Sequence, residues 1–177
     1  MGGKPKTRWD YFKHVSGLPV WNGQVRKIIA NASGRPLADY IPKSAHNRIR
    51  AEARLALGIY SLALISLLFS DFVLWVWILP LLLGQPFLRL YLLAEHGRCA
   101  FVANMLENTR TTYTNRFIRF LAWNMPYHAE HHTMPNVPFH ALPRLNTEMA
   151  RHLKSTTDGY SRFHKDYIAG FKASPNA

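Results

Sequence analysis

The chain contains one cysteine, Cys99, so it cannot form a disulfide bond within itself. A lone cysteine is most often a small buried or interfacial side chain, although this one follows His96 by three residues and could act as a soft metal ligand. Neither of the glycine-rich nucleotide-binding motifs occurs, so the sequence gives no support for a bound phosphate cofactor. Internal repeats and low-complexity tracts are absent as well, and 177 residues suffice for a single domain, 1–177, with a modest core.

Acidic residues are also scarce: ten Asp and Glu face 22 Lys and Arg, for a net charge of +12. The basic residues divide equally, with eleven from Lys4 to Arg54 and eleven from Arg89 to Lys172. Contact with anionic lipid head groups explains such flanks, since each basic residue near the surface contributes about 1 kcal/mol. Nucleic-acid binding is the alternative for a basic chain. No nucleic-acid motif is visible, so we predict no nucleic-acid partner.

Two apolar stretches lie between the basic flanks, at residues 55–69 and 72–94. A membrane-spanning helix needs about 20 mostly apolar residues, and both stretches come close to that length. The first follows some fifty polar residues, too far along for a signal peptide. The connector Ser70-Asp71 has no basic residue, whereas positive charge collects on the cytoplasmic side of membranes. We therefore predict an all-α integral membrane protein whose hairpin, 51–94, joins cytoplasmic segments 1–50 and 95–177. The alternative is a pair of buried helices in a soluble protein.

Helix arithmetic places His96 at the cytoplasmic end of the second predicted span. A helix from Asp71 to His96 is about 37 Å long, against about 30 Å of hydrocarbon. Pro80 and Pro86 are expected to kink that helix. The polar tail from Ser155 is expected to be mobile.

Three histidines, at positions 128, 131 and 132, form the most informative cluster in the chain. Residues three and four apart share one face of a helix, so all three rings can point the same way. Neutral imidazole binds iron, zinc, copper and nickel, and the cluster therefore predicts a metal site. It follows neither of the common zinc-peptidase spacings. The alternative is a solvated polar turn whose histidines are merely neighbours; His96 is likewise either a fourth ligand or an interfacial histidine that binds nothing.

These segments resemble the membrane fatty acid desaturases and their hydroxylase relatives. The runs WNMPYHAEHH (123–132) and PNVPFHALP (135–143) are similar to the family's third histidine box, and LLAEHG (92–97) is similar to the end of its last spanning helix. Residues 9–21 look like the stretch that follows the second box. The resemblance covers most of the chain.

The resemblance implies a fold, a cofactor and a reaction. Such enzymes hold two non-haem irons on histidines from three boxes, and oxygen activated there removes hydrogen from a lipid acyl chain. By position, the implied iron ligands are His96, His128, His131 and His132. Asn124 and Glu130 are implied to orient the ligand rings. A ferredoxin or a cytochrome-type protein is the expected electron donor.

The chain also departs from the family pattern, because the first and second histidine boxes are missing. The upstream histidines, His14 and His46, stand alone. We therefore expect the C-terminal half of a desaturase, incomplete and inactive alone, whether as a truncated frame, a split subunit with a separate N-terminal half or a decayed gene. The alternatives are a non-catalytic membrane metal-binding protein, since four histidines suffice for one tetrahedral site, a pseudoenzyme, or part of a lipid hydroxylase.

Overall fold

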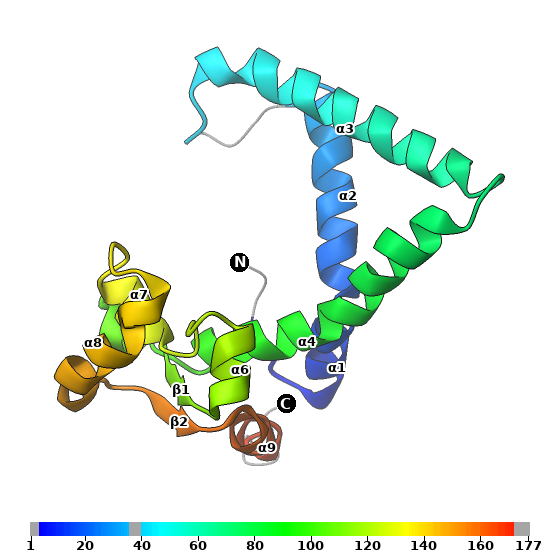
Figure 1. Ribbon diagram of the computed structural model, residues 1–177. Helices are drawn as coiled ribbons and strands as arrows, with labels where there is room; N and C mark the ends of the chain where they lie inside the picture. The colour runs from blue at the N-terminus through cyan, green and yellow to red at the C-terminus, as the bar shows by residue number, and fades with distance from the viewer. Residues whose placement is uncertain (1–3, 36–39, 172–177) are drawn as a thin grey trace. The chain divides into compact units, whose positions relative to one another are not determined.

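The computed structural model describes residues 4–35 and 40–171, and it is mostly helical with one short two-stranded sheet. The predicted helical class is confirmed in this coarse form, and the sheet is an addition to it. Contacts divide the chain into two compact units, residues 16–86 and residues 1–15 with 87–177. Figure 1 labels both strands and the helices α1–α4 and α6–α9.

The unit of residues 16–86 is built on two crossing helices. Helix α2 (Leu18–Ala32) begins after Gly17, whose positive φ of 74° suits glycine, and helix α3 (His46–Ser66) follows the short 3-10 helix η1 (Lys43–Ala45). Arg54 of α3 donates from Nε to the carbonyl of Ala32, at 3.0 Å. That carbonyl belongs to the last turn of α2, where no helical donor is available. Arg54 therefore caps the C-terminal end of α2 and links this helix to α3 by a hydrogen bond.

One helix in the described part of the chain is long and apolar enough to cross a membrane: residues Leu74–His96, a π-helical turn η2 (Leu74–Ile78) followed by α4 (Leu79–His96). The π turn has a local cause. Pro80 has no N–H to donate to the carbonyl of Val76, and the N–H of Leu79 bonds instead to the carbonyl of Leu74, five residues back. Pro86 lies inside α4.

Most of the first predicted span, residues 55–66, forms the second half of α3, which begins earlier than expected, at His46, and ends at Ser66; residues 67–69 form a turn. Its first half carries four charged side chains, Arg48, Arg50, Glu52 and Arg54. These charges keep α3 from qualifying as a membrane span of its own. The structure thus shows one candidate span, and the hairpin remains a prediction.

The second unit gathers short elements around the end of α4. In chain order these are α1 (Arg8–Ser16), α5 (Met105–Asn108), β1 (Thr111–Tyr113), α6 (Arg116–Leu121), α7 (His128–Thr133), η3 (Phe139–Ala141), α8 (Leu142–Met149), η4 (Ala150–His152), β2 (Thr156–Asp158) and α9 (Tyr160–Ala169). Strands β1 and β2 pair in parallel, with Thr111 opposite Thr156 (Figure 1). The sheet joins segments that are 45 residues apart in the sequence.

The expectation of a mobile tail from Ser155 was wrong for residues 155–171, which form β2 and α9, and its last part, 172–177, lies outside the described residues. Phe163 and Tyr167, one helical turn apart on α9, are buried against Leu93 and Ala94 of α4. The hydroxyl of Tyr167 also donates to the carbonyl of Pro5, at 3.0 Å. These two aromatic side chains thus contribute to fixing the segment on the core, together with Arg98, which donates to the carbonyls of Asp166 and Tyr167.

Candidate metal centre

The end of α4, which carries His96, is held by a buried arginine. Arg110 Nη1 donates to the carbonyls of Ala94 and Gly97, at 2.9 and 2.7 Å, and its backbone N–H donates to the carbonyl of Glu95, at 2.8 Å. The guanidinium also lies 4.7 Å from the centroid of the Phe163 ring. Since the last carbonyls of a helix lack helical donors, Arg110 supplies them and fixes the backbone on which His96 stands.

The start of α7, which carries His128, is held by strand β1. Thr111 pairs with Tyr127 as an antiparallel bridge, and the N–H of Thr112 donates to the carbonyl of Pro126, at 2.9 Å. Both threonines are fully buried. The strand therefore fixes the backbone immediately before His128.

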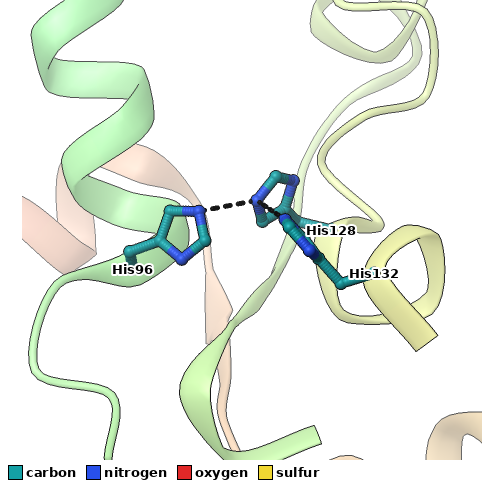
Figure 2. Close-up of side chains that lie close together, drawn as sticks. All are labelled: His96, His128 and His132. Atoms are coloured by element: carbon teal, nitrogen blue, oxygen red, sulfur yellow. Dashed lines mark hydrogen bonds between the residues drawn. The ribbon is translucent and has the colours of Figure 1, made fainter. Parts of the chain in front are cut away.

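Three histidine rings from these two helices converge on one point. Nε2 of His128 lies 2.9 Å from Nε2 of His96 and 3.0 Å from Nε2 of His132 (Figure 2). One ligand atom from each residue lies within 4.8 Å of the other two. The four-residue spacing of His128 and His132 puts both rings on the same face of α7.

This geometry and its electrostatics suit a cation. Two nitrogens bound to one ion at about 2.1 Å lie roughly 3.0 to 3.4 Å apart, and the two closest pairs are near the lower end of that range. Burial, together with the neighbouring rings of His132, His96 and His131, lowers the pKa of His128 to about 3. Burial likewise lowers the pKa of His132. Neutral rings keep the lone pairs that a metal needs.

His131, the fourth predicted ligand, is not part of this convergent group. Its ring centroid lies 6.2 Å from that of His128 and 5.7 Å from that of His132. Its Nδ1 is buried without a hydrogen-bond partner among the described residues. On a helix, residue i+3 is rotated further from residue i than residue i+4 is, which separates His131 from the pair.

The comparison with protein-family models decides the family. The model for fatty acid desaturase matches residues 4–164. The chain belongs to the fatty acid desaturase family. No curated protein and no solved structure matches it. Membership in this family implies an oxidoreductase with a lipid substrate and an association with membranes. This agrees with the resemblance seen in the sequence and with the apolar helix Leu74–His96.

The two residues predicted to orient the ligands act on the backbone and the packing of α7. Asn124 has a positive φ of 54°, and its carbonyl accepts from the N–H of Tyr127, at 3.1 Å, so it shapes the turn into α7. Glu130 is fully buried, and its carboxylate accepts from the Thr111 hydroxyl and the Asn146 amide. In the described chain these bonds join α7 to β1 and α8 rather than to a ligand ring.

Cys99, the weaker ligand candidate, lies outside the histidine group. Its thiol is near the backbone carbonyls of Gly97 and Glu95, at 3.7 and 3.9 Å. The other interpretation, a small buried side chain, fits this environment.

Sequence reasoning missed Glu95. This residue is only 1% exposed, and its Oε1 lies 3.4 Å from Nδ1 of His128. The available signal was an acidic residue at the end of an apolar helix, directly before a candidate ligand, where an unpaired carboxylate is costly.

Proposed function

We propose that this chain supplies part of the histidine-ligated di-iron site of a membrane fatty acid desaturase. The complete enzyme removes two hydrogens from a lipid acyl chain, and these, with O2, two electrons from a donor and two protons, give two waters. The observation that carries the proposal is the convergence of Nε2 atoms from His96, His128 and His132 in a chain of this family. His131 is proposed as the fourth ligand of this chain.

The residues present fit iron. Imidazole nitrogen is a common iron ligand in proteins, and the low pKa of His128 keeps its ring neutral at physiological pH. When bound, the irons would supply the oxygen chemistry. This chain's own contribution is to hold the rings: Arg110 fixes the end of α4, and Glu130 fixes α7 against β1 and α8. Asn124 forms the turn before α7, and we propose that Asn124 and Glu130 together keep the ligand rings in their orientation.

Four histidines cannot hold two irons in the manner of the family, whose ligands come from three boxes. We therefore propose that the remaining ligands come from outside these 177 residues, for instance from a separate N-terminal half. Membrane helices associate by close packing and interhelical hydrogen bonds, so the two parts need no covalent link. Alone, this chain is proposed to bind fewer than two irons and to desaturate nothing.

We also propose that residues 51–94 cross the membrane twice, with Leu74–His96 as the return helix. The two flanks carry equal numbers of basic residues, and the connector Ser70-Asp71 carries none. This charge distribution supports an orientation in which both ends of the chain, and the histidines, lie on the cytoplasmic side. A negatively charged ferredoxin or cytochrome-type donor would be attracted to the basic flanks, and this attraction should weaken with salt.

Metal titration of the full chain in detergent tests the site. Wild-type protein should bind iron or Co(II) at a ratio below two per chain, and His128→Ala should lose that binding. His152→Ala, which removes an exposed histidine on η4, is the matched control and should bind as wild type does. Equal binding by wild type and His128→Ala would refute the site.

Co-expression with a segment that carries the two missing boxes tests the activity. New double bonds in the host lipids, lost in His131→Ala, are the expected result. New hydroxyl groups instead would identify part of a lipid hydroxylase. Product that survives His131→Ala would contradict the ligand assignment.

A second candidate is a membrane protein with one metal and no catalytic role, including a pseudoenzyme. The specific observation in its favour is that three Nε2 atoms converge on a single point, which is enough to hold one metal ion. It predicts one metal per chain and no new lipid product even when the missing boxes are supplied.

A further inference from the structure

The strongest unexplained polar group near the metal centre is the carboxylate of Glu95. It is 1% exposed, and neither of its oxygens meets the geometry of a hydrogen bond among the described residues. The hydroxyls of Tyr91 and Tyr160 are close enough to interact with it electrostatically. A buried carboxylate without a hydrogen bond is costly, so its presence at this position needs a reason.

The nearest nitrogen is Nδ1 of His128, 3.4 Å from Oε1. That nitrogen is itself buried and lacks a hydrogen-bond partner in the described chain. The opposite nitrogen of the same ring, Nε2, faces His96 and His132. One imidazole thus lies between a buried carboxylate on one side and the metal-binding point on the other.

We propose that Glu95 is a positioning residue for the metal centre, and the proposal rests on the proposed function above. Its carboxylate accepts the Nδ1–H of His128, which fixes the tautomer that leaves the Nε2 lone pair free for the metal. Metal binding at Nε2 makes the ring a stronger donor at Nδ1, and the carboxylate then balances part of the added positive charge. Carboxylate–histidine–metal arrangements of this kind orient the ring and raise its basicity.

Two features distinguish Glu95 from Glu130, the other fully buried glutamate of this unit. The oxygens of Glu130 are already engaged by Thr111 and Asn146. Glu95, by contrast, has its Oε1 directed at a ring nitrogen and directly precedes His96, so one turn of α4 supplies both a ligand and the partner of a second ligand.

The test is a Co(II) titration of the full chain in detergent, read by affinity and by the d–d absorption of the bound ion. Glu95→Ala should bind Co(II) about 10- to 100-fold more weakly than wild type, the usual effect of removing such a partner. Glu95→Gln keeps an acceptor oxygen but loses the charge. It should therefore bind Co(II) more tightly than Glu95→Ala does, while its d–d bands remain shifted from those of the wild type. The matched control is Glu107→Gln on α5, where the Glu107 carboxylate accepts a hydrogen bond from the Asn104 amide; it should keep wild-type affinity and bands.

Unfolding of the metal-free proteins accompanies the titration. If Glu95→Ala does not fold, the near-isosteric Glu95→Gln carries the test through its shifted bands. Wild-type affinity and bands in both variants would overturn the role of Glu95 and leave the proposed function standing. Failure of the wild-type chain to bind Co(II) would overturn the proposed site itself, and the role of Glu95 with it.

Discussion

Replacing Arg110 by Met should strongly destabilise the unit that carries the histidines. Methionine fills a similar volume, but it leaves the carbonyls of Ala94 and Gly97 without their donor. A hydrogen bond from a charged group contributes about 1.5–3 kcal/mol, and a desolvated cation–π contact, here with Phe163, about 2 kcal/mol. Because one guanidinium makes all these contacts, the losses do not simply add, and we expect about 3–5 kcal/mol in total.

That loss is a large fraction of the 5–15 kcal/mol typical of a folded protein, so it should be easy to measure. Denaturant unfolding of the metal-free chain in detergent, followed by tryptophan fluorescence, gives the free energy directly. Arg110→Lys keeps the charge and should fall between wild type and Arg110→Met.

The matched control is Arg162→Met, because Arg162 is exposed and its ion pair with Asp158 spans 3.7 Å. It should change the stability by less than about 0.5 kcal/mol. If Arg110→Met proves no more harmful than Arg162→Met, the assignment of Arg110 as the residue that holds the end of α4 is wrong.

Three further predictions concern the same unit. A Cβ at Gly97 would lie 2.8 Å from Cζ of Phe163 and overlap the carbonyl oxygen of Leu93, so Gly97→Ala should lower the melting temperature, whereas Gly23→Ala, with open space around it, should not. Tyr167→Phe loses the hydrogen bond to the Pro5 carbonyl and should cost about 0.5–1.5 kcal/mol in denaturant unfolding; an unchanged midpoint would contradict the docking of the N-terminal segment on α9. Burial lowers the pKa of His164 below its ordinary 6.5, so the unfolded chain takes up a proton that the folded chain does not. The stability present above pH 6.5 should therefore fall as the pH drops below it, by up to about 1.4 kcal/mol per pH unit, and the fall should be shallower in His164→Gln.

The sequence alone was enough to identify the family and part of the site. The run at 123–132 points to a desaturase, and the family model confirms it. The apolar residues 72–94 coincide with the one candidate span of the described chain. The pairing of His128 with His132 follows from helical periodicity, because neighbours four apart share a face whatever surrounds them. These features are local, so a one-dimensional pattern contains them.

The remaining features depend on contacts between distant segments, which no local pattern encodes. His96 meets His128 only because Arg110 and β1 hold the ends of α4 and α7. The fold also buries Glu95 beside His128, and it buries Phe163 and Tyr167 of the tail against α4. The ligand role of His131 and the membrane hairpin remain predictions. The sequence by itself determined the family, the apolar helix before His96 and the metal-binding residue types. The tertiary structure decided which of those residues meet, because burial and distance are properties of the folded chain alone.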